Sequence, residues 1–219
     1  MWSDLSGWMS QTQTAISTNQ YKTPSDQSRA SSIDLEWASS VVASCQAHFT
    51  SPSRSSPPSL AFCHNDLLAG NVMREVATGR IQLIDFEYGG KNYTCFDIAN
   101  HFNEWAGGTD DSNPKYSQLP TPGEKRVFVE AYVSKMYELD ELGSKAGAVG
   151  GPAWCDEVET LLVDVEVFML INHVYWSFWG ACLAATEGCG EFDYLNYCGN
   201  RQKQAKVIEE EARRNMTGK

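Results

Sequence analysis

The sequence predicts an α+β fold that is mainly helical and contains one small β-hairpin. Two observations lead to this class. Apolar residues recur at the spacing of a single helix face in long segments, for example residues 124–137. Two short strand-like runs, residues 72–76 and 80–86, flank Thr78-Gly79, which is a turn signal. We therefore expect a helical body with a hairpin that carries the loops beside it.

Composition narrows the classes of function. A chain of 219 residues with 42% hydrophobic residues can bury a sizeable core and is expected to form one domain or at most two. The net charge of −11 argues against a nucleic-acid partner, because binding a phosphate backbone needs clustered Lys and Arg. The seven cysteines show no C-x-x-C pair or zinc-ligand spacing, and the N-terminus has no secretion signal. We expect reduced thiols and a cytoplasmic location.

The first part of the chain is expected to form two entry helices separated by polar connectors. Residues 2–16 carry apolar side chains at helical spacing, whereas residues 17–32 are polar and serine-rich and predict a loop. Ser31, with Asp34 three positions later, can cap a second helix. The apolar stripe of that helix consists of Leu35, Ala38, Val42, Cys45 and Phe49. Residues 50–59 (TSPSRSSPPS) end the helix and predict a flexible connector.

The segment after this connector contains the strongest chemical pattern. Residues 60–63 predict a short apolar strand that leads into His64-x-Asp66, and Asn71 follows five residues later. The hairpin then returns the chain so that Asp85 comes to the region of Asp66 and Asn71. There Asp66 can take the proton of a substrate hydroxyl, while the oxygens of Asn71 and Asp85 can hold Mg²⁺ between phosphates. The alternative is a hairpin whose Asp and Asn side chains only cap turns.

This order and spacing are those of the catalytic loop and metal-binding carboxylate of kinases. The segment resembles the choline/ethanolamine kinase family more specifically. HNDLLAGN (residues 64–71) is similar to the catalytic loop of that family, and IDFEYGGKNYTCFDIANHFNEW (residues 84–105) is similar to its second signature. The matching positions in the second signature are Asp85, Glu87, Tyr88, Asn92, Asp97, Asn100 and Glu104. Weaker similarity extends over residues 35–197, and the HNDLL and NEWAG runs resemble the ethanolamine branch more than the choline branch.

The resemblance implies transfer of the γ-phosphoryl group of ATP, with Mg²⁺, to the hydroxyl of a small amino alcohol on a two-lobed, protein-kinase-like fold. For ethanolamine this is the first step of phosphatidylethanolamine synthesis by the CDP-ethanolamine route. In this interpretation Asp66 and Asn71 are catalytic, and Asp85 and Asn71 bind the metal. The residues expected to support these loops are His64, Glu87, Asn92, Asp97 and Asn100.

Residues 94–105 predict a helix with one polar and one apolar face. The polar stripe consists of Asp97, Asn100, His101 and Glu104, at i, i+3, i+4 and i+7. Such a stripe is most often a solvated face, but this one directly follows the metal-binding strand and contains no Lys or Arg. We therefore predict that Asp97 holds the catalytic loop by hydrogen bonds and that Glu104 is free to meet a cationic substrate. We assign no role to His101.

A second group of residues suits an ammonium group. Trp176 and Trp179 are three positions apart on a long predicted helix, so both side chains can face one pocket. Glu191 and then Tyr197 follow after a short loop. Aromatic pairs on an apolar helix are more often core residues. By the resemblance, however, these positions match aromatics around the substrate ammonium, where cation–π attraction amounts to roughly 0.5–2 kcal/mol per ring.

The composition of this group favours ethanolamine over choline as a hypothesis. A quaternary ammonium has no N–H group and needs aromatic rings all round, whereas a primary ammonium needs carboxylate acceptors. The choline branch has further aromatics just after the second signature, where this sequence has Gly107-Gly108-Thr109. Glu104 and Glu191 remain as acceptors.

The rest of the chain is expected to be largely helical and to build the substrate side. Residues 107–123 predict a polar loop, residues 143–151 a glycine-rich linker, and Pro152 the first turn of a long helix. The apolar run at residues 167–185 is long enough to raise the question of a membrane span. Polar residues near its middle favour a buried core helix instead. The charged tail, residues 192–219, predicts a helix with a solvated face.

By the resemblance, residues 1–219 form one C-terminal kinase lobe, with entry helices at 1–59, the catalytic and metal-binding segment at 60–106 and the substrate-binding part at 107–219. No glycine-rich strand-turn-strand and no strand lysine precede His64, so we expect the N-terminal nucleotide-binding lobe to be absent. Two alternatives stay open: a catalytically inactive lobe that serves as a binding or regulatory module, and a phosphotransferase of the aminoglycoside type. The sequence is compatible with a homodimer or with pairing to an intact kinase chain.

Overall fold

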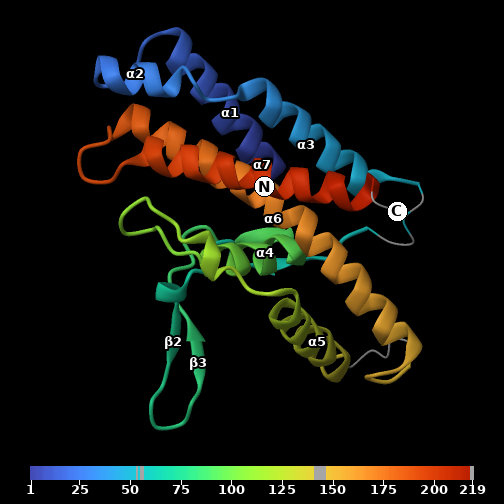
Figure 1. The fold of residues 1–219 in the computed structure, drawn as a ribbon. Helices are drawn as coiled ribbons and strands as arrows, with labels where there is room; N and C mark the ends of the chain where they lie inside the picture. The colour runs from blue at the N-terminus through green and yellow to red at the C-terminus, as the bar shows by residue number, and fades with distance from the viewer. Residues whose placement is uncertain (53, 55–56, 141–146, 218–219) are drawn as a thin grey trace.

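The computed structural model describes residues 1–52, 54, 57–140 and 147–217. Within these residues the chain forms seven α-helices and four short β-strands (Figure 1). The helices are α1 (Trp2–Ser17), α2 (Pro24–Ala30), α3 (Leu35–Thr50), α4 (Thr94–Glu104), α5 (Pro122–Glu138), α6 (Pro152–Thr186) and α7 (Tyr194–Thr217). The strands are β1 (Leu60–Cys63), β2 (Val72–Arg74), β3 (Ile81–Leu83) and β4 (Gly90–Tyr93), and single 3₁₀ turns are η1 (Ala69–Asn71) and η2 (Tyr116–Gln118). The prediction of a mainly helical fold with a small hairpin is confirmed, and the hairpin is joined by a second small sheet.

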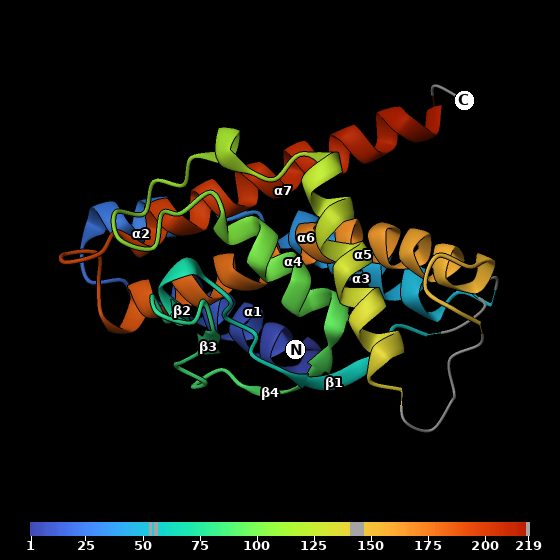
Figure 2. The ribbon, with the colours of Figure 1, turned by 90° about the horizontal axis from the view of Figure 1, so that it is seen from below.

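Helix α6 is the centre of the fold. It packs against α1, α3, α4, α5 and α7, and Figure 2 shows α4 lying across it with α5 alongside. Apolar residues occur all round its axis because helices cover several of its sides, and Phe168, Ile171 and Val174 are fully buried. By length and composition alone α6 passes as a membrane span, yet 67% of its most apolar window is buried among the other helices. It occupies the position of a core helix.

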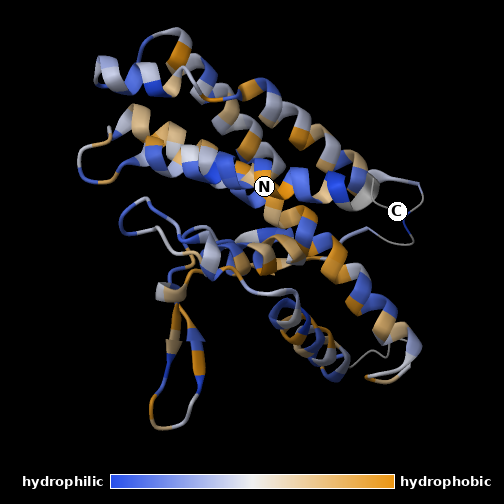
Figure 3. Cartoon of the chain, in the orientation of Figure 1, coloured by the Kyte–Doolittle hydropathy of each residue, from blue (hydrophilic) through white to orange (hydrophobic). Residues whose placement is uncertain are grey.

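Two antiparallel sheets, each of two strands, present the loops that carry the chemical pattern. Strand β1 pairs with β4 so that Cys63 lies opposite Gly90, and the chain leaves β1 and enters β4 at the same end of this sheet. Strand β2 pairs with β3 so that Val72 lies opposite Leu83. The residues just before β2 and just after β3 are therefore neighbours. The β2–β3 hairpin projects from the helical body, and Figure 3 shows hydrophobic residues on it.

Two features of the secondary structure differ from the prediction. Residues 17–32 are not a loop throughout, because α2 begins within them at Pro24. The hydroxyl of Thr23 accepts a hydrogen bond from the backbone N–H of Asp26, and proline suits the first helical turn. Strand β4 was not predicted either. Its sequence, Gly-Lys-Asn-Tyr, has no apolar alternation, and it forms a strand because it completes the sheet with β1.

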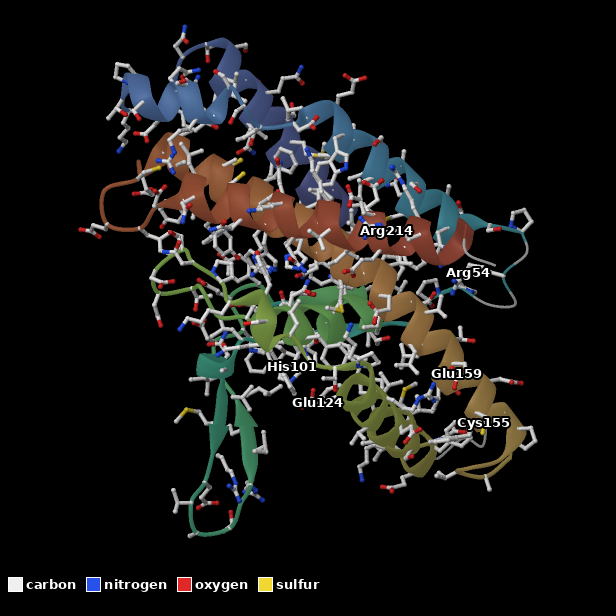
Figure 4. All side chains as sticks on the ribbon, in the orientation of Figure 1. Arg54, His101, Glu124, Cys155, Glu159 and Arg214 are labelled. Carbon is white, nitrogen blue, oxygen red and sulfur yellow. The ribbon has the colours of Figure 1, made fainter. Side chains whose placement is uncertain are left out.

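The start of α3 also differs in detail. Its N-cap is Asp34, whose carboxylate accepts a hydrogen bond from the backbone N–H of Trp37, rather than Ser31. After α3, Arg54 forms two hydrogen bonds of 2.7 Å with the carboxylate of Asp164 on α6, and Figure 4 shows Arg54 near the end of α3. This ion pair joins the connector to the central helix. Residues 53 and 55–56 of the expected connector and residues 143–146 of the expected linker lie outside the described residues.

Candidate active site

A pocket of about 180 Å³ lies between the catalytic loop and helices α4, α6 and α7. Its wall combines carboxylates with aromatic rings. The residues that line it are Asp66, Leu68, Glu87, Tyr88, Glu104, Thr109, Trp176, Trp179, Phe192 and Tyr197. The fold thus brings the aspartate of the catalytic loop into the same cavity as the two tryptophans, which lie more than a hundred positions later in the chain.

The loop after β1 is fixed by hydrogen bonds from two sides. Asp97, on α4, accepts hydrogen bonds from the backbone N–H groups of His64 (2.8 Å) and Asn65 (2.7 Å). Asn65 adopts the left-handed backbone conformation (φ 68°), which asparagine tolerates better than most residues. Its side chain donates to the carbonyl of Tyr88 (2.8 Å) and accepts from the amide of Asn92 (2.8 Å). Asp97 therefore bonds directly to the backbone of the loop, and Asn92 reaches the loop through the side chain of Asn65.

His64 connects this loop to the strand that leads to Asp85. Its Nε2–H donates to the carbonyl oxygen of Ile84 (2.7 Å), and its Nδ1 accepts from the backbone N–H of Asp66 (3.3 Å). A carbonyl oxygen can only accept, so these partners select the tautomer with the proton on Nε2. The imidazole also packs against the ring of Phe86, with centroids 4.6 Å apart. The side chain of His64 thus links the backbone of Asp66 to that of Ile84, the residue that precedes Asp85.

Asn71 lies beside Asp66. Its amide Nδ2 donates to the backbone carbonyl of Asp66 (2.9 Å) and to the carboxylate oxygen Oδ2 (3.2 Å). This orientation leaves the amide oxygen of Asn71 as an acceptor for a cation. The backbone carbonyl of Asn71 accepts from the N–H of Ile84 (3.0 Å), which keeps the loop next to the residue that precedes Asp85.

The pKa of the Asp66 carboxyl is raised to about 6. Burial is the largest cause, the charge of Glu104 adds to it, and Asp85 makes a smaller contribution, while His64 and the hydrogen bond from Asn71 lower the pKa. A carboxyl with this pKa is mostly ionised at neutral pH but more basic than an ordinary aspartate. Those properties suit a group that accepts a proton from an alcohol.

Asp85 and Asn71 carry side-chain oxygens of the kind that a magnesium ion uses. Asp85 is exposed and has a left-handed backbone conformation (φ 61°). Among the described residues no group of three or more His, Cys, Asp or Glu is placed to hold a metal ion. Mg²⁺ commonly uses one or two protein oxygens and completes its shell with water and phosphate oxygens. The carboxylate of Asp85 and the amide oxygen of Asn71 have the required chemistry. Glu87, also exposed, lines the pocket two residues further on.

Trp176 and Trp179 form the aromatic wall on α6. Their ring centroids lie 5.4 Å apart with planes at 79°. The indole N–H of Trp176 donates to the side-chain oxygen of Asn100 (2.7 Å), and that of Trp179 donates to the hydroxyl of Tyr88 (3.0 Å). Tyr197, from α7, lies 5.9 Å from Trp179. These hydrogen bonds orient the two indoles, so the wall is fixed by directed contacts as well as by packing.

Two predicted substrate residues lie differently from the prediction. Glu104 lines the pocket but is not free, because Arg201 of α7 forms a buried ion pair with it. Glu191 is exposed and is not part of the pocket wall. The loop between α6 and α7 instead turns Phe192 inward, where its ring packs 5.8 Å from that of Tyr197, and this leaves Glu191 outside.

Two residues of α4 have other partners than expected. Asn100 was predicted to support the catalytic loop, but its side-chain oxygen accepts from Trp176 and from the amide of Asn172 (3.0 Å) on the aromatic side. His101, which had no assigned role, donates from Nδ1 to the carbonyl of Leu67 in the catalytic loop (3.1 Å). Figure 4 shows His101 on α4. The spacing of the polar stripe located both residues but did not indicate which of them faces the loop.

A family model described as choline/ethanolamine kinase matches residues 1–206, nearly the whole chain. The chain belongs to the choline/ethanolamine kinase family. Ethanolamine kinase 1 from Mus musculus is 38% identical over 146 residues, and probable choline kinase 1 from Arabidopsis thaliana is 37% identical over 148 residues. Each alignment covers 66% of this chain but only 37% and 39%, respectively, of the relative. The matched region therefore spans less than two fifths of these curated kinases.

Solved structures of the kinase family share the fold. An ethanolamine kinase from Plasmodium vivax superposes with a TM-score of 0.68 at 22% identity, over 94% of this chain and 48% of that one. A choline kinase from Cryptosporidium parvum superposes with a TM-score of 0.62 at 21% identity, over 95% of this chain and 56% of that one. At this level of identity the likeness concerns the arrangement of the helices and strands.

Proposed function

We propose that this kinase-family chain provides the site at which the γ-phosphoryl group of ATP is transferred to the hydroxyl of ethanolamine. The observation that carries the proposal is the position of Asp66. It lines a small pocket whose other walls hold Glu104 and the indoles of Trp176 and Trp179. A carboxylate at one side and aromatic rings at the other suit a molecule with a hydroxyl at one end and an ammonium at the other.

Asp66 acts on the alcohol. With a pKa of about 6 it is mostly ionised at neutral pH and accepts the hydroxyl proton as the oxygen attacks phosphorus. Its backbone N–H is held by His64, and its carboxylate receives the amide of Asn71, so it approaches the substrate from a fixed direction. General-base action of this kind contributes roughly 10²–10⁴ in rate.

Asp85 and Asn71 would hold Mg²⁺. When bound, the ion neutralises charge on the β- and γ-phosphates and fixes their orientation. The contribution of the chain itself is to keep the two oxygen ligands beside the base. Ile84, which precedes Asp85, donates its backbone N–H to the carbonyl of Asn71 and accepts a hydrogen bond from the side chain of His64.

Ethanolamine is favoured over choline by the residues at the edge of the pocket. Thr109, a small polar residue, lines the pocket where additional aromatic rings would help to enclose a quaternary ammonium. Glu104 supplies carboxylate oxygen to an ammonium that has N–H groups. The similar proteins carry both names, ethanolamine kinase and choline kinase.

We also propose a cytoplasmic location, in agreement with seven cysteines that are all free thiols.

A second candidate function is a binding module that pairs with another protein chain. Large apolar side chains are exposed beside the site, with Phe62 70%, Ile81 55% and Phe86 46% exposed. Apolar surface of this kind marks a place where another protein surface can pack. Such a module would hold an amino alcohol or a partner without transferring phosphate.

Two measurements on the chain separate these functions. The first is a side-by-side turnover assay with Mg²⁺-ATP and either ethanolamine or choline. We expect phosphorylation of both, with a higher kcat/KM for ethanolamine, and a clear preference for choline contradicts the assigned substrate. The second is calorimetry with Mg²⁺-ATP alone. Heat of binding supports the enzyme, whereas absence of binding together with absence of turnover supports the binding module.

A further inference from the structure

Arg201 is a cation in the interior of the protein. Its side chain is only 1% exposed, and it is the largest fully buried side chain among the described residues. A buried charge is unfavourable unless it is paired and hydrogen-bonded, and an ion pair in such a position is often replaceable by apolar residues without loss of stability. The position of Arg201 beside the pocket therefore points to a role other than stability.

Arg201 makes three contacts that fix its position. Nη2 pairs with Oε1 of Glu104, Nη1 lies 3.2 Å from Nδ1 of His173, and the guanidinium lies 4.9 Å from the ring centroid of Tyr197. Burial, together with the nearby Arg201 charge, lowers the pKa of His173 well below its usual value, so the imidazole is neutral and Nδ1 accepts the hydrogen bond. Tyr197 and Arg201 are four positions apart on α7 and so lie on one face of that helix.

The carboxylate of Glu104 is engaged on one side only. Oε1 is taken by Arg201, whereas Oε2 is buried and has no hydrogen-bond partner among the described residues. The side chain is only 4% exposed and belongs to the pocket wall. An unpaired carboxylate oxygen in such a place is an acceptor that a ligand can satisfy.

We propose that Arg201 is a positioning residue that sets substrate specificity by holding Glu104 through Oε1, so that Oε2 alone is offered to an ammonium with N–H groups. The inference rests on the proposed function, since it concerns the ligand chemistry of the same pocket. Because Arg201 neutralises the charge of Glu104, the carboxylate gives little general attraction to cations. A primary ammonium gains a hydrogen bond from Oε2, whereas a quaternary ammonium has no N–H to donate and is held by the aromatic rings alone.

The charge balance makes a distinctive prediction for two opposite variants. Arg201→Met removes the cation and leaves the negative charge of Glu104 facing the pocket. The affinity for every ammonium should then rise, and the relative increase should be largest for choline. Glu104→Gln leaves the positive charge of Arg201 uncompensated, which repels every ammonium. The two changes therefore shift choline binding in opposite directions, whereas a purely structural pair predicts weaker binding in both.

The test is a fluorescence titration of the pocket tryptophans with ethanolamine, N-methylethanolamine, N,N-dimethylethanolamine and choline. This readout does not depend on phosphoryl transfer. For the wild type we expect the affinity to fall along the series, with the largest step at the loss of the last N–H. In Arg201→Met we expect choline to bind about tenfold more tightly, equivalent to about 1.4 kcal/mol, and the preference for ethanolamine to fall accordingly. Arg214→Met, on the exposed face of the same helix (Figure 4), should match the wild type.

The outcomes separate this inference from the proposed function. If the wild type binds none of the four ligands, the proposed function fails and this inference fails with it. If the wild type binds them but Arg201→Met weakens all four equally, Arg201 has a structural role and only the inference is overturned. If Arg201→Met does not fold, the double variant Glu104→Leu/Arg201→Met removes both charges and the acceptor oxygen. It should then bind the four ligands with similar affinity, and wild-type selectivity in that variant overturns the inference.

Discussion

The two sides of the pocket are held in different ways. On the loop side, Asp97 and His64 hold the catalytic loop by short hydrogen bonds to backbone groups, and Asn92 donates to the side chain of Asn65 in that loop. The residues joined by these bonds are close in the sequence, because all of them lie in the segment from His64 to Asp97. On the helical side, the aromatic rings of α6 and α7 pack together, and the polar link between Glu104 and Arg201 joins residues almost a hundred positions apart.

The difference has a physical cause. A loop that must direct a carboxylate and a metal ligand needs fixed backbone directions, which hydrogen bonds supply. A surface that binds an ammonium by its charge needs area and a low water content, which packed rings supply. We therefore expect changes of single atoms to act most strongly on the loop side, and changes of ring size to act on the helical side.

The largest effect is expected for Asp66→Asn on the loop side. The amide cannot accept the hydroxyl proton, so kcat should fall by roughly 10²–10⁴. The folded protein holds this carboxyl at a pKa of about 6 against an ordinary 3.8, so its ionised form at pH 7 opposes folding. The neutral amide should therefore raise the free energy of unfolding at pH 7. Steady-state kinetics and urea unfolding measure both.

The matched control for this variant is Asp110→Asn, in an exposed loop. It should leave kcat and stability at wild-type values. Ethanolamine binding to Asp66→Asn, followed by tryptophan fluorescence, should persist, because the aromatic wall is untouched. Wild-type turnover in Asp66→Asn rules out the assigned base.

The next effect is expected for Asp97→Asn. The amide oxygen can accept from one of the two backbone N–H groups of His64 and Asn65, but the amide nitrogen cannot accept from the other. One buried donor loses its partner, so the free energy of unfolding should fall by about 1–3 kcal/mol. Because the loop also carries Asp66, kcat should fall with it. Urea denaturation and kinetics give the two values, and an unchanged kcat argues that the loop is positioned by other contacts.

A smaller effect on kcat/KM is expected from changing the pH of the assay. The base must be ionised, and the folded pKa of Asp66 lies near 6, so kcat/KM should be flat above this pH and fall about tenfold per pH unit below it. A profile from about pH 4.5 to 8 with ethanolamine checks this. A profile that stays flat down to about pH 4.5, as a carboxyl with the ordinary pKa of 3.8 would give, shows that burial does not control the group in the working protein. The residual activity of Asp66→Asn should lack the inflection.

The smallest effect is expected on the helical side, for Trp179→Leu. Loss of one ring removes roughly 0.5–2 kcal/mol of cation–π attraction, which is about two- to thirtyfold in Kd for ethanolamine. The matched control is Trp105→Leu, since Trp105 is 40% exposed and lies outside the pocket wall. Isothermal titration calorimetry measures both. Equal weakening by the two variants means that the pocket does not hold the ammonium.

The sequence predicted the loop side better than the helical side. Asp66 and Asn71 lie five positions apart in one loop and contact each other, so a local pattern suffices to bring them together. Arg201 was missed because the charges around it indicated a solvated helix, although its position four residues after Tyr197 placed it on the inner face. Glu191 was misplaced because packing of the neighbouring Phe192, rather than any local pattern, decides the direction of its loop.

The same distinction applies to the fold. Long helices such as α6 were predicted because apolar periodicity is a local property. Strand β4 was missed because its only reason to be extended is its partner β1, about thirty positions earlier. Helix α2 was hidden by serine-rich composition, and its signal was the cap at Thr23 followed by Pro24.

The central claim is that Asp66 and Asp85 serve one phosphoryl transfer to an amino alcohol. The most direct measurement is ³¹P NMR of the chain with Mg²⁺, ATP and ethanolamine, with a parallel sample that lacks ethanolamine. We expect the γ-phosphate signal to be replaced by phosphoethanolamine and ADP only when ethanolamine is present. An unchanged ATP spectrum in both samples, or equal loss of ATP in both, contradicts the claim.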